Sequence, residues 1–258
     1  RFFKNLLENA VRQIETRRPK AVILIDYPGF NLRLAKKIKA LNIPIIYYIS
    51  PQIWAWGGKR IKLIQKLVDL MLVILPFEKD IYDRVGLKNQ FVGHYLLDDI
   101  PPEYIKAPYN IESDLISLLP GSRPQEIEKM LPVLLDTARL LHKGKKWRFA
   151  VAAVEGNFDY QKILNNVDFP IEIQKGKTRE LIARSRLVIT SSGTATLETG
   201  IIGRPMIVIY KTGMITYLIA RSVVKLDMIA LINISAGRKI VPELIQSSAS
   251  PANIADEA

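Results

Sequence analysis

Short apolar runs alternate with segments of helical spacing along most of this chain. Runs rich in Val, Ile and Leu, without polar alternation, are typical of parallel strands that are covered on both faces. Alternation of such strands with helices predicts an α/β fold built on doubly wound sheets. In the first part of the chain, strands are expected at residues 21–25, 43–49, 70–75 and 90–92, and helices at about 31–41 and 57–67.

A segment with three prolines, between Asp98 and Pro108, then interrupts the alternation. Prolines clustered in a polar stretch are typical of linkers. Beyond this segment, strands are expected at 116–119, 147–153, 171–173, 186–190 and 205–210, and helices at 124–142, 178–185 and 194–202. The sequence therefore predicts two Rossmann-like domains, residues 1–103 and 104–258, with a cleft between them.

Two loops of small and hydroxyl residues, 119–123 and 191–198, each join an expected strand to an expected helix in the second domain. Backbone N–H groups at a helix start attract anions, and the helix dipole adds positive potential there. Two such turns predict a site for a nucleotide diphosphate, as in enzymes that use nucleotide sugars. The residues expected to hold the phosphates are Gly121, Ser122, Arg123, Ser192, Gly193 and Thr194.

Asp26 ends the first expected strand, and ligands of open α/β sheets bind at the carboxyl ends of strands. A carboxylate in this place is a candidate general base. The alternative is a structural aspartate that caps the turn formed with Tyr27, Pro28 and Gly29.

Three further side chains are candidates for substrate contacts. Trp54 lies in a loop that also carries glycines and cations, which suggests an aromatic rim for a sugar or acyl chain; a packed loop is the alternative. His94 follows the strand expected at 90–92, although a lone histidine is more often structural. Glu198 lies four residues after Thr194 and could accept hydrogen bonds from ribose hydroxyls, or simply interact with the helix start.

Composition narrows the classes of molecule that the protein is expected to bind. The net charge of +12, from 37 Lys and Arg against 25 Asp and Glu, favours anionic partners: phosphorylated substrates, an anionic membrane face or nucleic acid. A basic surface that only aids solubility is the alternative. The absence of cysteine excludes disulfides and thiol chemistry and is compatible with a cytoplasmic protein. No apolar run approaches the ~20 residues that a membrane span needs.

Several motifs of other enzyme classes are missing. The chain has no Asp-x-Asp, no Walker loop and no Gly-x-Gly-x-x-Gly fingerprint. Two histidines far apart in the sequence, without cysteine, argue against a zinc site. We therefore expect no metal and no other cofactor, and no nucleic-acid recognition motif is visible.

The chain resembles the lipid-A-disaccharide synthase family, inverting glycosyltransferases of the GT-B type. The motifs that carry the resemblance fall in family order and cover almost the whole chain. They are Ser50-Pro51-Gln52-Ile53-Trp54-Ala55-Trp56, Leu75-Pro76-Phe77-Glu78, Gly93-His94, Leu118-Leu119-Pro120-Gly121-Ser122-Arg123, Ser192-Gly193-Thr194-Ala195 and Ala236-Gly237-Arg238.

The resemblance implies transfer of 2,3-diacylglucosamine from UDP onto 2,3-diacylglucosamine 1-phosphate, at the inner face of a Gram-negative inner membrane. It implies that Asp26 is the catalytic base, that Arg123 is the essential arginine and that Glu198 is the carboxylate after the Ser-Gly-Thr loop. Asn233 lies where the family has Leu-Pro-Asn and is expected to contact substrate, although Ile232 replaces the proline.

The resemblance further implies a chain truncated at both ends, because the family's glycine-rich N-terminal loop and closing C-terminal helices fall outside it. A homodimer is a possible assembly. Alternatives are another GT-B enzyme that uses UDP-GlcNAc, such as a 2-epimerase or a peptidoglycan transferase, an inactive homologue, and a polyanion binder without catalysis.

Overall fold

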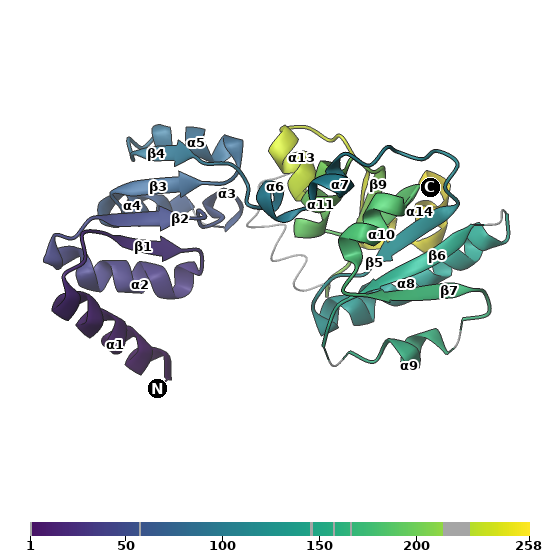
Figure 1. The fold of residues 1–258 in the computed structure, drawn as a ribbon, viewed down its shortest axis with the longest axis horizontal. Helices are drawn as coiled ribbons and strands as arrows, with labels where there is room; N and C mark the ends of the chain where they lie inside the picture. The colour runs from purple at the N-terminus through teal and green to yellow at the C-terminus, as the bar shows by residue number, and fades with distance from the viewer. Residues whose placement is uncertain (1, 57, 145–146, 157, 166, 214–227) are drawn as a thin grey trace. The chain divides into compact units, whose positions relative to one another are not determined.

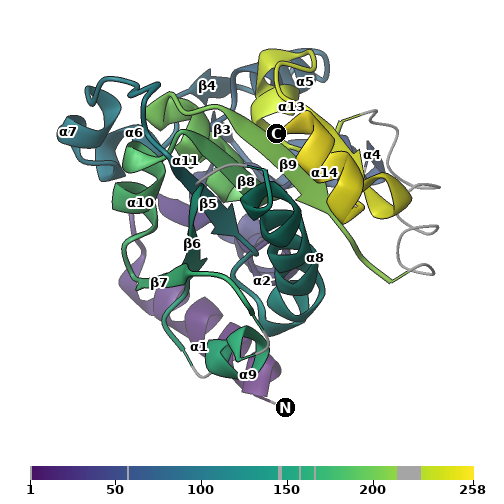
Figure 2. The same cartoon turned by 90° about the vertical axis from the view of Figure 1, so that its right-hand side faces the viewer.

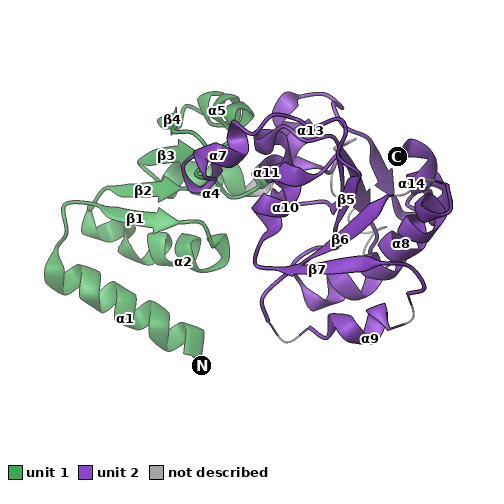
Figure 3. Ribbon diagram, turned by 45° about the vertical axis from the view of Figure 1, so that its right-hand side comes forward, with its two compact units in different colours: residues 1–95, 223–225 green, residues 96–222, 226–258 purple. Residues whose placement is uncertain are grey.

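The chain divides into two compact units. The computed structural model describes residues 2–56, 58–144, 147–156, 158–165, 167–213 and 228–258. The first unit ends at Tyr95 and the second begins at Leu96 (Figure 3). This division falls ahead of the proline-rich segment. Helix α6 (Leu96–Asp99), which runs into that segment, and helix α7 (Pro102–Ile105), which lies within it, both belong to the second unit.

The first unit is a parallel sheet with strands in the order β1-β2-β3-β4 (Figure 1). Its strands are β1 (Val22–Ile25), β2 (Ile45–Tyr48), β3 (Leu70–Val73) and β4 (Asn89–Phe91), and its helices are α1 (Phe2–Arg17), α2 (Pro28–Ile38), α3 (Ile53–Trp56), α4 (Gly58–Leu67) and α5 (Pro76–Asp83). Each strand expected in this part of the sequence is present. Helix α2 begins earlier than expected because Pro28 suits the first helical turn, where its missing N–H costs nothing.

The core of this unit follows the alternation of side chains along the strands. Leu24, Tyr47 and Met71 point to the face that the helices cover and are almost fully buried. Ile23 and Ile25 point to the opposite face, and both are more than half exposed. The two faces of β1 therefore differ sharply in burial.

The second unit contains a six-stranded parallel sheet in the order β10-β9-β8-β5-β6-β7. Its strands are β5 (Leu115–Leu119), β6 (Arg148–Ala153), β7 (Ile171–Lys175), β8 (Leu187–Ser191), β9 (Met206–Tyr210) and β10 (Glu243–Ile245). Counted from β5, this is the order 3-2-1-4-5-6 of dinucleotide-binding sheets. The strand order reverses between the parallel strands β5 and β8, because the chain adds strands outward from β5 on one side and then from β8 on the other. The carboxyl ends of these two strands therefore form the topological switch point where such sheets bind ligands.

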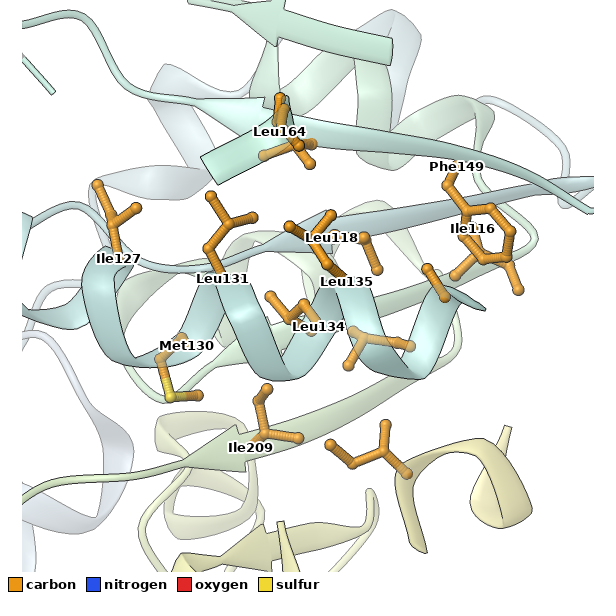
Figure 4. Packing of buried hydrophobic residues seen from close by; sticks show 14 of the residues in the cluster. Ile116, Leu118, Ile127, Met130, Leu131, Leu134, Leu135, Phe149, Leu164 and Ile209 are labelled. Atoms are coloured by element: carbon orange, nitrogen blue, oxygen red, sulfur yellow. The ribbon is translucent and has the colours of Figure 1, made fainter. Parts of the chain in front are cut away.

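Helices cover both faces of this sheet (Figure 2). One face carries α8 (Pro124–His142), α9 (Tyr160–Leu164) and α14 (Pro251–Glu257), and the other carries α10 (Thr178–Arg184), α11 (Thr194–Ile202) and α13 (Leu231–Ala236). Apolar side chains of α8, including Leu131 and Leu134, pack on Leu118, Phe149 and other strand residues in a mainly apolar core (Figure 4). Helices α8 and α11 have the bounds that the sequence predicts.

A buried arginine binds the proline-rich segment ahead of β5 to the rest of the second unit. Arg204 is only 5% exposed and donates to the backbone carbonyls of Ala107, Pro108 and Ala183, at 2.7–3.2 Å. Its desolvation lowers the pKa of the guanidinium, while the carbonyl oxygens satisfy its N–H groups. The expected linker is therefore bound to the second unit. Among the described residues, no helix combines the length and apolarity needed to cross a membrane.

Candidate active site

A pocket of about 630 Å³ opens at the switch point of the second unit. It lies where β5 and β8 end, and both glycine-containing loops that the sequence predicts contribute to it. Of the predicted residues, it brings together Gly121, Ser122, Ser192, Gly193, Thr194 and Glu198. The segments after β6 and β7 complete the wall, with Glu155, Lys177 and Arg179.

The first loop turns at Gly121, whose φ of 113° is unfavourable for residues with a side chain. Helix α8 follows, and Glu126 in its first turn reaches back to the loop. The Glu126 carboxylate accepts from the backbone N–H groups of Ser122 and Arg123, at 3.3 and 3.4 Å, and from the Arg123 guanidinium at 2.9 Å. Arg123 is not among the residues that line the pocket, and its side chain is 77% exposed.

The second loop turns at Gly193, which has a φ of 145° and precedes the first residue of α11. The Gly193 carbonyl accepts from the Thr196 hydroxyl at 2.7 Å, which fixes the first turn of the helix. The Ser192 hydroxyl donates to the Ile229 carbonyl at 3.0 Å. The N–H groups of the first helical turn therefore face the pocket at a defined place.

A carboxylate and an arginine stand side by side in the pocket. Glu198 accepts from Arg179 Nε at 2.9 Å, and its side chain is 16% exposed. Arg179 also donates to the Asp99 backbone carbonyl at 2.7 Å and forms an ion pair with the Asp99 carboxylate. No local sequence pattern points to Arg179, because its partners lie 19 and 80 residues away.

In the first unit, Asp26 follows β1 and is exposed, as a base that meets a substrate requires. Asp26 and Tyr27 both adopt left-handed backbone conformations, with φ of 45° and 40°. Such conformations cost about 1–2 kcal/mol for each non-glycine residue. Two strained residues in succession are unusual, and strain of this kind concentrates at functional sites.

A hydrogen bond between Trp54 and Glu78 connects α3 and α5, the helices that follow β2 and β3. Trp54 Nε1 donates to Glu78 Oε1 at 3.3 Å, and the Trp54 ring packs edge-on against Phe77. Glu78 is 2% exposed, and burial raises its pKa against the opposing effect of hydrogen bonds from Leu75 and Trp54. The Trp54 ring is therefore held by contacts within the first unit. The side chains of residues 55–59 lie outside the described part of the chain.

Two other predicted site residues, His94 and Asn233, contact neighbouring parts of the chain. His94 stacks on Tyr95 with ring centroids 4.6 Å apart, and partial burial lowers its pKa. Asn233 is fully buried: its amide nitrogen donates to Val241 and Glu243, and its amide oxygen accepts from two backbone N–H groups. This placement gives Asn233 a role in holding the chain after α13 and leaves its amide no group for a substrate.

The whole chain, residues 1–258, matches the family model described as Lipid-A-disaccharide synthetase. A lipid-A-disaccharide synthase from Anaeromyxobacter dehalogenans strain 2CP-C is 41% identical over 258 residues, which cover 95% of this chain and 67% of that protein. One from Myxococcus xanthus is 37% identical over 262 residues, with 98% of this chain and 68% of that protein covered. The chain thus spans about two thirds of the length of these relatives.

The chain belongs to the lipid-A-disaccharide synthase family. This membership, which the sequence motifs predicted, makes the chain a hexosyltransferase of lipid A biosynthesis.

Solved structures similar to this family member share its fold. The UDP-GlcNAc 2-epimerase of Methanocaldococcus jannaschii, in complex with UDP-GlcNAc and UDP, has a TM-score of 0.58 at 12% identity, with 99% of this chain and 72% of that chain covered. Spinosyn rhamnosyltransferase complexed with thymidine diphosphate has a TM-score of 0.55 at 16% identity, with 99% and 68% covered. Identities this low show the fold alone, and that fold is the predicted GT-B type.

Proposed function

We propose that this chain transfers 2,3-diacylglucosamine from UDP to the 6-hydroxyl of 2,3-diacylglucosamine 1-phosphate. The products are a β-1,6-linked disaccharide 1-phosphate and UDP. The observation that carries the proposal is the pocket at the switch point of the second unit, formed by two loop–helix junctions in a chain of this family.

The donor's diphosphate fits the two loops of that pocket. Backbone N–H groups of Gly121, Ser122, Gly193 and Thr194 would bind the phosphate oxygens, and the dipoles of α8 and α11 favour negative charge there. Glu126 now accepts from the Ser122 and Arg123 N–H groups, so diphosphate binding must displace its carboxylate. Arg123, released from Glu126, would then pair with the phosphates and stabilise the charge on departing UDP.

The ribose fits beside Glu198. One carboxylate oxygen accepts from Arg179, which leaves the other able to accept from ribose hydroxyls. Arg179 bonds to both Glu198 and Asp99 and would hold the Glu198 carboxylate in its orientation.

Asp26 serves as the general base in a direct displacement. Its carboxylate takes the proton from the acceptor 6-hydroxyl while this oxygen attacks the anomeric carbon of the donor sugar. The bond from that carbon to the UDP oxygen breaks, its electron pair leaves with UDP, and the configuration inverts. Fixed cations and helix dipoles stabilise the leaving group in this scheme.

A groove of about 410 Å³ beside the Asp26 loop suits an acylated, phosphorylated acceptor. Apolar side chains of Phe3, Leu7 and Phe30 line it, and the cations Lys4 and Arg33 stand beside them. An acyl chain would cover the apolar part, while the cations would attract the 1-phosphate.

The same chemistry suits an anionic membrane surface, where acylated substrates reside. A net charge of +12 favours such a surface, and the predicted location is the cytoplasmic face of the inner membrane. Binding to phosphatidylglycerol vesicles should exceed binding to phosphatidylcholine vesicles and should weaken with salt. A homodimer, also proposed, would show as twice the chain mass in light scattering.

The transferase is tested by measuring UDP release from UDP-2,3-diacylglucosamine with and without the 1-phosphate acceptor, using the Myxococcus xanthus relative as the assay control. Acceptor-dependent release supports the proposal. UDP binding without release contradicts it and favours an inactive homologue. Conversion of UDP-GlcNAc without acceptor would instead favour the epimerase that shares the fold.

A further inference from the structure

The loop that carries Asp26 is held by side chains outside it. Asn31 Nδ2 in α2 donates to the carbonyls of Ile25 at 2.9 Å and Asp26 at 2.7 Å. The Tyr47 hydroxyl in β2 donates to the same Asp26 carbonyl at 2.6 Å. The Asp26 carbonyl therefore accepts two side-chain hydrogen bonds while its N–H donates to the Tyr48 carbonyl at 2.9 Å.

These bonds fix the strained backbone. In the left-handed conformation of Asp26, the carbonyl and the side chain leave Cα in directions that differ from those in a strand. Rotation of the Asp26 peptide toward an extended conformation would break the bonds from both Asn31 and Tyr47. The direction in which the carboxylate points is thus coupled to two donors that do not touch it.

Tyr47 suits this task because it is fully buried at the centre of the sheet. Burial, and next the nearby Asp26 charge, raise the pKa of the Tyr47 phenol far above its ordinary value of about 10. The hydroxyl therefore stays a donor at every pH at which an enzyme assay is run.

We propose that Asn31 and Tyr47 are positioning residues for the transfer reaction, which act by holding the Asp26 loop so that the Asp26 carboxylate meets the acceptor hydroxyl. The inference rests on the proposed function, in which Asp26 is the base. Both residues belong to the first unit, whereas the pocket proposed for UDP is lined by residues of the second unit.

A double-mutant cycle separates positioning from a general structural role. Asn31→Ala and Tyr47→Phe are each made in the wild-type and in the Asp26→Ala background. We expect each to lower kcat by about 10-fold to 100-fold in the wild type, the scale of loss that misplacing a reacting group causes. In the Asp26→Ala background, neither should lower kcat further, and the donor KM and UDP affinity should stay unchanged in all variants.

Matched controls exist in the same unit. Tyr82 is also fully buried, and its hydroxyl bonds to Ser50 at 2.8 Å; Asn89 Nδ2 also donates twice, to Asp83 and Leu87. Tyr82→Phe and Asn89→Ala remove the same atoms without breaking a hydrogen bond to the Asp26 loop. They should lower stability to a similar degree while kcat stays within about twofold of the wild type.

A readout independent of activity is the ¹³Cα chemical shift of Asp26, which reports its left-handed backbone. It should move in Asn31→Ala and Tyr47→Phe and stay in both controls. If Asn31→Ala does not fold, Tyr47→Phe, which loses one oxygen atom, carries the test.

The outcomes are distinguishable. Equal fold-losses of kcat in both backgrounds, equal losses in the controls, or an unmoved Asp26 shift would overturn the positioning role while leaving Asp26 as the base. Wild-type turnover in Asp26→Ala would overturn the base and the positioning role together. UDP affinity, measured in each variant, checks the second unit separately.

Discussion

The loop after β1 and the loops after β5 and β8 all follow the carboxyl end of a parallel strand but present different chemistry. The first presents the Asp26 side chain from a turn in which Asp26 and Tyr27, both non-glycine residues, adopt strained backbone conformations. The others present backbone N–H groups on turns at Gly121 and Gly193. A base needs one carboxylate in one direction, whereas a diphosphate needs several donors close together. Side chains bond to all three loops, but the first turns on non-glycine residues and the other two turn on glycines.

The largest effect is expected for Asp26→Gly. Turnover should fall by about 10²-fold to 10⁴-fold, the usual contribution of a general base. The thermal midpoint should not fall, because glycine adopts a φ of 45° without strain. Rate and melting curves check the prediction. Asn42→Gly, which relieves a φ of 55° elsewhere in the unit, should keep full activity; a melting point lowered only by Asp26→Gly would contradict the strain argument.

Arg123→Ala should lower kcat/KM for the donor by roughly 10-fold to 100-fold, since a hydrogen bond to a charged group contributes about 1.5–3 kcal/mol. Arg123→Lys should recover part of the loss, because it keeps the charge without the fork of donors. Steady-state rates against donor concentration check this. Arg148→Ala removes the same charge at the first residue of β6 and should leave kcat/KM unchanged.

The two glycines should differ from each other. A side chain at Gly193 would meet open space, so Gly193→Ala suffers only from its φ of 145°. A Cβ at Gly121 would lie 3.1 Å from Glu126 Cβ and 3.3 Å from Ser191 Oγ, which remain in place when the Glu126 carboxylate moves, so Gly121→Ala adds crowding to the strain. UDP affinity, measured by calorimetry, should fall in both, by an amount worth about 1–3 kcal/mol, with Gly121→Ala the weaker binder. Gly144→Ala, outside the pocket, should bind UDP normally; equal affinity in all three variants would refute the glycine argument.

The smallest effect concerns the environments of two carboxylates, the partly buried Glu198 and the buried Glu78. Glu198 has Arg179 beside it, whereas Glu78 has hydrogen-bond donors and a pKa raised by burial. Because folded Glu78 keeps its proton to higher pH than the unfolded chain, stability should fall as pH rises above its ordinary pKa of 4.5. Urea midpoints followed by tryptophan fluorescence should show this fall in the wild type and a smaller one in Glu78→Gln. Exposed Glu103→Gln should behave as the wild type.

Much of the fold could be predicted because most strands of both units, such as β3 (Leu70–Val73) and β9 (Met206–Tyr210), are short apolar runs. The strands expected in the first unit and the helices α8 and α11 follow from periodicity and from residues such as Pro124 and Gly203 at helix ends. Strand β10 and helix α14 were not predicted, since Glu243–Ile245 is too short to give a clear pattern.

The candidate site was less predictable, because its contacts join distant parts of the chain. The loops at Gly121 and Gly193 could be read from local sequence, but the bond of Glu198 to Arg179 could not. Asn233 shows the opposite difficulty: its position in a motif predicts a substrate contact, while its partners Val241 and Glu243 become visible only in the folded chain. The left-handed backbone at Asp26 could not be predicted from the sequence, because the residue is not a glycine.

The central claim is that the second unit binds UDP through its glycine turns while the first unit supplies the base. Calorimetric titration of UDP into the wild type, Asp26→Ala and Gly193→Ala tests it most directly. We predict equal UDP affinity for the wild type and Asp26→Ala, and weaker binding for Gly193→Ala. Loss of UDP binding in Asp26→Ala, or unchanged binding in Gly193→Ala, would contradict the account.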